Sequence, residues 1–266
     1  MKRDKLGDRM KTNYEEVYKF KLTRRTPVII RLDGKAFHTF TRGFQKPFDE
    51  ILIKSMQDTM KYLCQNIQGC VLGYTQSDEI TLVLIDYKKL NSEAWFDYEV
   101  QKLSSVSASM ATFAFNKFFE YNVEKFKEEM KDLTIEIDQK YLNTLENCIE
   151  KGAMFDSRCF NIPREEVTNC ILWRQQDATR NSIQMLAQHF FPQKVIDNRS
   201  NNELQDMLFT QKGINWNDLP TYQKRGSCCI KNEEGYWKID LNIPKFVNEG
   251  RNYIENLIQP ETEVNK

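Results

Sequence analysis

Two aspartates in this chain stand beside short apolar runs that have the composition of β-strands. Asp33 directly follows the run at 27–32, and Asp78 lies between the runs at 71–76 and 80–85. We expect the first run to be a buried strand with Asp33 at its carboxyl end, and the other two to form a β-hairpin with Asp78 near its tip. Two carboxylates at adjacent strand ends can bridge two divalent cations, which orient a nucleophilic oxygen and neutralise a triphosphate. The pair therefore predicts metal-assisted phosphoryl transfer.

The neighbours of the two aspartates fit the same chemistry, although each also has a plain structural interpretation. Gly34 has no side chain to keep a metal from its backbone carbonyl, and Ser77 has a hydroxyl for a phosphate. Arg31 is charged within an apolar strand, so it needs an anionic or hydrogen-bonding partner. Taken singly, Asp-Gly after a strand is usually a turn, and the Ser-Asp-Glu sequence at 77–79 is usually a hairpin tip. Only the combination favours a catalytic site.

The elements that must position these residues follow a βαββαβ order. The strand at 27–32 is followed by an amphipathic helix capped by Asp49, then the hairpin, a long helix at 93–119 and a strand at 154–162. Elements in this order form an antiparallel sheet with the helices on one face. The sequence therefore predicts an α+β fold with a ferredoxin-like, polymerase palm-like core. Nucleotide cyclases share this core, so the fold alone does not decide the function.

The rest of the chain is expected to elaborate this core. Residues 1–163 form the palm-like catalytic core, within which the charged segment 121–151 is a solvated helical excursion. Residues 164–258 form a carboxy-terminal α/β extension that packs on the core and contributes to RNA and nucleotide binding, and residues 259–266 form a frayed tail. The extension contains a helical stretch at 165–191 and strands at 227–231 and 236–241.

Composition excludes several classes of protein. The 266 residues are 40% hydrophobic and 29% charged, which is enough for a core and unlike a disordered chain. Because 38 basic residues balance 38 acidic ones, RNA binding must come from local patches. An odd number of cysteines, seven, with no CxxC pair argues against a disulfide framework or a zinc knuckle. Without a signal-like or membrane-spanning apolar run, we expect a cytoplasmic protein that does not enter membranes.

Five longer stretches carry a pattern that extends beyond the aspartates. They are RLDGKAFHTFTRGFQKPFDE (31–50), GYTQSDEITLVL (73–84), MFDSRCFNIP (154–163), WRQQDATRNSI (173–183) and GINWNDLPTYQKRGSCCI (213–230). In this order they resemble the tRNA-histidine guanylyltransferase superfamily, and most closely its 3′-to-5′ polymerase branch, which repairs tRNA 5′ ends. Several ordered matches are far more specific than one motif.

The resemblance implies a palm in which Asp33, Asp78 and the carbonyl of Gly34 hold two Mg²⁺ ions. It also implies a reaction in which the 5′-monophosphate of a tRNA is activated by ATP or GTP and is then attacked by the 3′-hydroxyl of an incoming nucleoside triphosphate. Nucleotides are thereby added in the 3′-to-5′ direction. The same resemblance implies a homotetramer whose RNA site spans subunits.

The resemblance also assigns substrate contacts. Nucleotide and triphosphate contacts fall on Arg31, Lys46, Ser77 and Asn181, and Lys102 falls near the RNA 5′ end. Cations and amide donors suit a polyphosphate. Without the resemblance, Lys46 and Lys102 would be interpreted as ordinary solvated lysines.

A group of aromatic and basic residues in the predicted helix at 165–191 allows two interpretations. Trp173, Arg174 and Arg180 are expected to bind RNA, because aromatic rings stack on bases and guanidinium groups contact phosphates. Equally, Trp173 could belong to the core, with Arg174 paired with Asp177 on the helix surface.

One segment departs from the family. Eukaryotic members that act on tRNA-His carry His-Ile-Asn-Asn-Leu-Tyr-Asn-Thr, whereas the matching positions 179–186 here read TRNSIQML and keep only Asn181. This favours the repair branch, which completes 5′-truncated tRNAs by copying the opposite strand. Addition of a single G to tRNA-His is the second candidate. A palm-type nucleotide cyclase and a non-catalytic RNA-binding protein are further alternatives, and the intact Asp33 and Asp78 argue against the last.

Overall fold

A computed structural model of the protein describes residues 4–133, 135 and 138–261. Its centre is a six-stranded sheet in the order β4-β1-β3-β2-β5-β6, in which every neighbouring pair is antiparallel. The strands are β1 (Val28–Gly34), β2 (Cys70–Gln76), β3 (Glu79–Leu84), β4 (Phe155–Asn161), β5 (Ser227–Lys231) and β6 (Trp237–Asp240).

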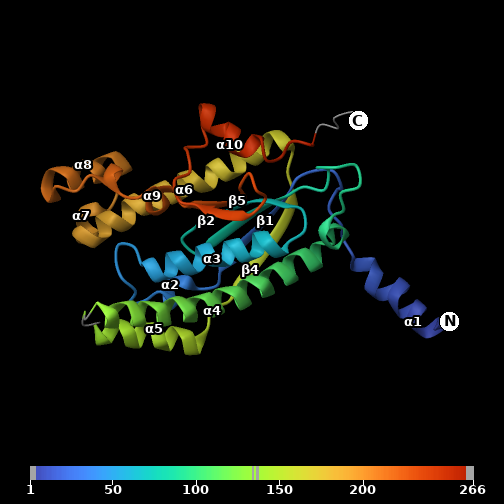
Figure 1. The fold of residues 1–266 in the computed structure, drawn as a ribbon, viewed down its shortest axis with the longest axis horizontal. Coiled ribbons are helices and arrows are strands. Elements are labelled where there is room, and N and C mark those ends of the chain that lie inside the picture. The colour runs from blue at the N-terminus through green and yellow to red at the C-terminus, as the bar shows by residue number, and fades with distance from the viewer. Residues whose placement is uncertain (1–3, 134, 136–137, 262–266) are drawn as a thin grey trace.

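Helices cover both faces of this sheet (Figure 1). The longer ones are α3 (Glu50–Asn66), α4 (Val100–Asp132), α5 (Gln139–Lys151), α6 (Arg164–Phe190) and α8 (Asn201–Lys212). The short ones are α1 (Lys5–Met10), α2 (Phe37–Phe40), α7 (Gln193–Ile196), α9 (Thr221–Arg225), α10 (Asn252–Glu255), the π-helix η1 (Lys11–Glu15), and the 3₁₀ turns η2 (Glu16–Tyr18), η3 (Trp95–Tyr98), η4 (Trp216–Asp218) and η5 (Asn248–Arg251). None of the described helices combines the length and the apolar composition that a membrane span requires.

The predicted α+β fold is confirmed. Strands and helices of the core follow the order β1, α3, β2, β3, α4, β4, and α3 and α4 lie on the same face of the sheet (Figure 1). The opposite face is covered by α6 from the carboxy-terminal extension. The boundary expected at residue 163 falls between β4 and α6, yet β5 and β6 extend the core's own sheet beyond β2. Core and extension therefore share one sheet.

The sequence of β1 shows why the sheet becomes polar at one end. Val28, Ile30 and Leu32 pack into the apolar cluster beneath α3 and α4, and Ile29 packs on the α6 side. Because strand side chains alternate between faces, Arg31 and Asp33 follow Ile29 on the α6 side. That face is therefore apolar where β1 begins and charged where it ends.

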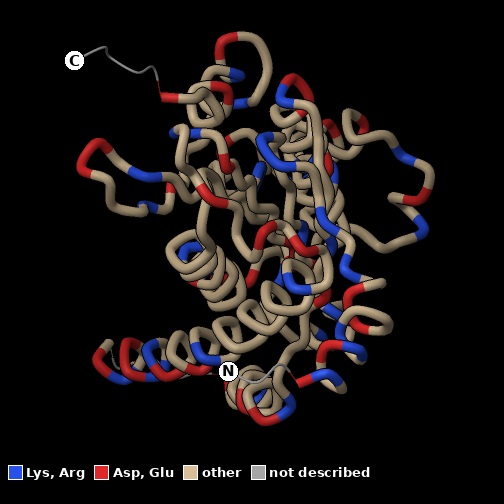
Figure 2. The backbone as a smooth tube through the Cα atoms, turned by 90° about the vertical axis from the view of Figure 1, so that its right-hand side faces the viewer, with Lys and Arg blue, Asp and Glu red and all other residues tan. Residues whose placement is uncertain are grey.

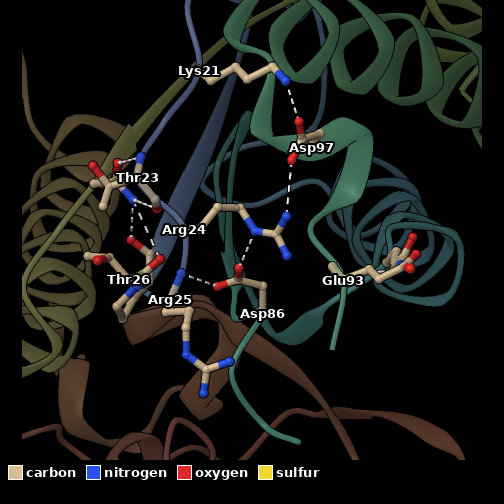
Figure 3. A network of polar contacts seen from close by, with 11 residues as sticks. Lys21, Thr23, Arg24, Arg25, Thr26, Asp86, Glu93 and Asp97 are labelled. Atoms are coloured by element: carbon tan, nitrogen blue, oxygen red, sulfur yellow. Dashed lines mark hydrogen bonds and ion pairs between the residues drawn. The ribbon is translucent and has the colours of Figure 1, made fainter. Parts of the chain in front are cut away.

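The long helix α4 differs from its prediction at both ends. It begins at Val100 rather than near residue 93, and it continues to Asp132. Before it, Phe96 and Asp97 have positive φ angles of 49° and 50° within η3. Asp97 forms ion pairs with Lys21 and with Arg24 (3.0 Å), and Arg24 also pairs with the fully buried Asp86 (2.6 Å), as Figure 3 shows. Contacts with distant residues therefore stabilise a turn where local propensity favours helix.

The charged excursion predicted at 121–151 is helical in its described part. It consists of the second half of α4 and of α5, which lies alongside α4 (Figure 1); residues 134, 136 and 137 lie outside the described residues. One face of α5 is buried rather than solvated, through Tyr141, Leu145 and Cys148. Of the expected tail at 259–266, residues 262–266 also lie outside the described part.

Asp49 connects this excursion to the core. As predicted, it caps α3, accepting a hydrogen bond from the Leu52 N–H at 3.0 Å. The buried carboxylate also accepts from the Gln45 N–H (3.0 Å) and from the Tyr141 hydroxyl (2.8 Å). One side chain thus anchors the start of α3, the preceding loop and α5.

We predict that Asp49→Ala lowers the free energy of unfolding by about 2–4 kcal/mol, because a helix cap is lost and a buried hydroxyl loses its acceptor. Urea denaturation measures the change. Asp49→Asn keeps an acceptor and should cost less than half as much, while Tyr141→Phe should leave the cap intact. Equal stability of Asp49→Ala and the wild type would show that this cluster does not hold α3.

Candidate active site

The structure brings Asp33 and Asp78 to neighbouring strand ends. Asp33 is the penultimate residue of β1 and lies opposite Glu79, the first residue of β3. Asp78 lies in the two-residue turn between β2 and β3, and its carbonyl oxygen accepts a hydrogen bond of 3.1 Å from the Gly34 N–H. The backbone itself therefore fixes the two aspartates beside each other.

The surroundings of Asp78 disfavour an isolated negative charge. Burial raises the pKa of the Asp78 carboxyl, and repulsion from Asp33 raises it further, while a hydrogen bond of 3.0 Å from the Ser77 hydroxyl opposes the shift. A cation between two neighbouring, partly buried carboxylates stabilises their charged forms. Carboxylate and carbonyl oxygens are the hard ligands that Mg²⁺ prefers, so these residues fit such an ion.

These side chains do not complete a metal site by themselves. Within the described ranges, no group of three or more His, Cys, Asp or Glu side chains is arranged to hold a metal. Mg²⁺ commonly binds through one or two carboxylates plus water and substrate phosphates. The carbonyl of Gly34, water and phosphate oxygens would therefore complete the coordination around Asp33 and Asp78.

Packing requires Gly34 independently of any metal. A Cβ atom at this position would lie 2.2 Å from the Phe37 ring. Phe37 in turn packs against Phe115 and Phe155, with ring centroids 5.5 and 5.2 Å away. The sequence motif points to the backbone carbonyl of Gly34, whereas the structure shows that the aromatic core also excludes any side chain here.

Charged residues form two cross-strand rows on the α6 side of the sheet. The outer row is Asp156, Asp33, Glu79 and Gln76, and the inner row is Arg158, Arg31, Thr81 and Tyr74. Acidic groups thus lie at the end of the sheet, with two arginines one row behind them. This order places fixed positive charge directly beside the carboxylate pair.

Arg174 reaches this surface from α6 and forms a buried ion pair. Its side chain is 8% exposed, and its Nη1 donates to Glu79 Oε2 at 2.9 Å. Burial raises the pKa of the Glu79 carboxyl, although the nearby Arg174 and Arg31 act against the shift. The pairing of Arg174 with Asp177, part of one of the two sequence interpretations, is also present at 3.4 Å, but Arg174 is buried and does not lie on the helix surface. The stronger contact, with Glu79, is one that the sequence reasoning missed.

The Trp173 ring lies beside the guanidinium groups of both Arg31 and Arg174. The guanidinium carbon of Arg174 lies 3.5 Å from the Trp173 ring centroid, and that of Arg31 lies 5.5 Å away. Trp173 is 47% exposed, so it does not belong to the core. The Nε atom of Arg31 is buried without a hydrogen-bond partner in the described structure. Unlike Arg174, Arg31 has no carboxylate partner among the described residues.

A pocket beside the hairpin tip unites two of the residues expected to contact nucleotide. Ser77 and Asn181 line it together with the start of α3, the adjacent part of α6, and Tyr222 and Gln223 of α9. Lys46 is exposed on the loop that leads into α3, two residues before Phe48, which also lines this pocket. A hollow beside the hairpin tip thus combines the polar Ser77 and Asn181 with apolar walls that include Leu52, Ile53 and Met185.

Two of the residues expected to contact RNA lie away from this pocket. Lys102 is exposed in the first turn of α4, where it pairs with Glu99 at 3.6 Å. Because α4 covers the opposite face of the sheet, one chain does not bring Lys102 to the carboxylates. Arg180 is exposed on α6 and pairs with Asp177 at 2.8 Å.

Comparison with known proteins agrees with this geometry. Residues 7–163, more than half of the chain, match the family described as "Thg1: tRNAHis guanylyltransferase". The chain belongs to this family. The resemblance of the sequence motifs to the tRNA-histidine guanylyltransferase superfamily is therefore confirmed.

This tRNAHis guanylyltransferase family member has relatives in viruses and eukaryotes. It is 31% identical over 236 residues to the uncharacterized protein R259 of Acanthamoeba polyphaga mimivirus, and the aligned region covers 83% of this chain and 75% of that protein. It is 28% identical over 221 residues to the tRNA(His) guanylyltransferase of Saccharomyces cerevisiae, with 78% and 83% covered.

Solved structures show the same fold in other family members. A bacterial tRNA(His) guanylyltransferase (Thg1)-like protein in complex with ATP superposes with a TM-score of 0.80 at 43% identity, covering 96% of this chain and 99% of that one. A structure of such a bacterial protein with GTP gives 0.75 at 40% identity, with the same coverage. The Saccharomyces cerevisiae enzyme, at 23% identity and a TM-score of 0.64 over 87% of this chain and 96% of that one, supports the fold alone.

We predict that Asp78→Asn abolishes nucleotide addition without lowering the melting temperature in EDTA at neutral pH. The raised pKa of Asp78 means that its charged form opposes folding above that pKa, so removing the charge relieves repulsion. Mg²⁺ should raise the melting temperature of the wild type but not of this variant.

The matched control is Asp156→Asn, which lies opposite Asp33 in the outer cross-strand row but is exposed and paired with Arg158. It should keep most of the Mg²⁺-dependent shift. An equal Mg²⁺ shift in Asp78→Asn and the wild type would remove the metal assignment.

We predict that Arg174→Met lowers the free energy of unfolding by about 3–5 kcal/mol, because it leaves Glu79 buried without its cation. The double variant Glu79→Gln/Arg174→Met should recover a large part of this loss in a double-mutant cycle. If Arg174 served only to contact RNA, its replacement would leave the unfolding free energy unchanged.

Proposed function

We propose that this protein is a template-directed 3′-to-5′ nucleotidyltransferase that adds nucleotides to the 5′ end of truncated tRNA. The observation that carries the proposal is the carboxylate pair Asp33 and Asp78, beside a pocket lined by Ser77 and Asn181, in a chain of this family. The bacterial relatives bound to ATP and to GTP support either nucleotide as the activator and as a substrate. Addition of a single G to tRNA-His is the second candidate.

The carboxylates of Asp33 and Asp78 and the carbonyl of Gly34 would hold two Mg²⁺ ions. When bound, such ions neutralise a triphosphate and lower the barrier to attack at phosphorus. The fixed backbone between β1 and the hairpin holds the ligands in place, so little reorganisation is needed as substrates bind.

Donors near the carboxylates suit the two phosphoryl transfers. In the first, the tRNA 5′-monophosphate attacks the α-phosphate of ATP or GTP, and pyrophosphate leaves. In the second, the 3′-hydroxyl of the incoming nucleoside triphosphate attacks the activated 5′ phosphate, and the activating nucleoside monophosphate leaves. Ser77 and Asn181 face the pocket with a hydroxyl and an amide, and Lys46 stands at its approach. Arg31, with its unpartnered Nε, lies one row behind Asp33. These groups would bind the polyphosphates through charge-assisted hydrogen bonds.

The position of Lys102 supports an assembly of several copies. Because α4 holds it on the opposite face of the sheet from the carboxylates, a role of Lys102 at an RNA 5′ end would place it at the site of another subunit. A homotetramer with shared sites, as the family resemblance implies, would accommodate this placement.

The segment 179–186 supports selection by the template. Ser182, Ile183 and Leu186 are buried in the extension, and the Ser182 hydroxyl accepts a hydrogen bond of 3.0 Å from the Trp216 indole. Only part of the segment, including Arg180 and Asn181, faces outward. With few side chains left to recognise one tRNA, base choice would come from pairing with the opposite strand, because a mispaired nucleotide misaligns its 3′-hydroxyl.

We predict that the protein extends 5′-truncated tRNAs other than tRNA-His with whichever base pairs with the opposing nucleotide. The assay uses Mg²⁺, all four nucleoside triphosphates and transcripts whose opposing base is varied across the four nucleotides. Asp33→Asn is the inactive control, and omission of tRNA tests for cyclase activity, which would consume triphosphate alone. Extension of tRNA-His only, always with G, would instead establish the second candidate.

A further inference from the structure

A groove lies against α6, separate from the pocket lined by Ser77 and Asn181, which we call the nucleotide pocket. The groove is lined by Gln176, Thr179 and Arg180 of α6, Trp216 of η4, Arg225 of α9, and Lys245. The nucleotide pocket takes Ala178, Asn181, Ser182 and Met185 from α6 instead. The short helix α9 contributes to both, through Tyr222 and Gln223 to the pocket and through Arg225 to the groove.

Positive charge gathers in this groove with little compensation. The guanidinium carbon of Arg225 and the Nζ of Lys224 lie 5.8 and 5.7 Å from the Trp216 ring centroid. Burial lowers the pKa of Arg225, and burial followed by repulsion from Arg225 lowers that of Lys224. Within the described residues Arg225 forms no ion pair. A partly desolvated cation without a carboxylate is stabilised by a bound anion.

Two acidic side chains near the groove leave a positive excess. Asp177 is engaged by Arg180 at 2.8 Å and by Arg174 at 3.4 Å. Asp218 attracts Lys224, which donates its ammonium proton to the carbonyl of Asn217. Arg225 and the exposed Lys245 therefore remain available to a ligand.

Hydrogen bonds hold the walls of the groove in place. Gln175 donates to the Pro244 carbonyl (2.8 Å) and accepts from the Phe246 N–H (3.0 Å), which fixes the segment carrying Lys245 against α6. The Trp216 indole donates to the Ser182 hydroxyl at 3.0 Å, which fixes the ring beneath Arg225. The cations thus lie on a rigid frame.

We propose that this groove binds the phosphodiester backbone of the RNA substrate. The charge pattern elsewhere favours this location, because Lys and Arg are intermingled with Asp and Glu over the view in Figure 2 and the chain carries no net charge. An RNA held here would lie across α6 from the nucleotide pocket, within reach of the same α9. Phosphate contacts of this kind position an RNA without reading its sequence. The identity of the ligand as tRNA rests on the proposed function.

The test measures binding of a fluorescently labelled 5′-truncated tRNA by anisotropy across a series of KCl concentrations. We expect Arg225→Gln and Lys245→Gln each to raise Kd about tenfold at moderate salt. Each should also reduce the slope of log K against log salt by about one. Arg225→Lys should keep the wild-type slope. Lys245 is exposed, so its variant reports on binding even if Arg225→Gln unfolds.

Lys140→Gln is the matched control, because Lys140 is exposed on α5, on the other side of the sheet. It should leave Kd and slope unchanged, and all groove variants should bind ATP like the wild type. Unchanged tRNA affinity and slope in both groove variants would overturn the proposal, even with nucleotide addition intact. A wild type that adds no nucleotide but loses tRNA binding with these variants would overturn the proposed function and leave the groove assignment standing.

Discussion

The structure depends on how negative charge is compensated at the end of its sheet. Asp33, Asp78, Glu79 and Asp156 meet there on adjacent strands, and each would repel the others. Glu79 is neutralised by Arg174 and Asp156 by Arg158. Among the described residues, Asp33 and Asp78 have no such ion pair. The protein therefore compensates the flanking carboxylates with its own cations, and the proposed metal ions would compensate the central pair.

This division makes α6 part of the site rather than an accessory layer. The helix supplies Arg174 to the sheet, Asn181 to the nucleotide pocket and Arg180 to the basic groove. The extension is also tied to the core at the pocket's rim, because Gln57 of α3 donates to the Ser227 hydroxyl at 2.9 Å and Gln223 donates to Glu50 at 2.6 Å. A change in how α6 packs on the sheet would therefore move the pocket and the groove together.

Sequence patterns predicted the parts of this structure that local interactions decide. Short apolar runs predicted β1 and the hairpin, and Asp49 marked the first turn of α3, because strand composition and helix caps are local properties. The start of α4 was missed, since the left-handed turn at Phe96 and Asp97 depends on Lys21 and Arg24, far away along the chain. The predicted helix therefore began near residue 93 instead of Val100, because the helix propensities of the residues between them do not indicate the turn.

Contacts between residues far apart in the sequence also limited the prediction of the site. The need of Arg31 for a partner followed from its place in an apolar strand, but Trp173, its ring partner, lies on α6 and is not visible from β1. Similarly, Glu79 and Arg174 are 95 positions apart, so neither motif indicated the other. The steric reason for Gly34 was local in sequence yet required the rotamer of Phe37, which the packing of the aromatic core determines.

Recognition of a polyanion by a chain without net charge places a physical demand on this arrangement. The chain has no net charge, so no long-range electric field attracts RNA to the molecule. The binding energy must come from individual cations, and contacts within the folded protein must already offset the free-energy cost of removing water from them. Two indole rings help to meet this demand, because Trp173 lies beside Arg31 and Trp216 lies beside Arg225. Neither of these two guanidinium groups has a carboxylate partner among the described residues. An aromatic face stabilises a cation while leaving its N–H donors directed elsewhere. Arg31 and Arg225 therefore keep N–H donors for a phosphate, and their attraction for it acts mainly within a Debye length of each guanidinium group.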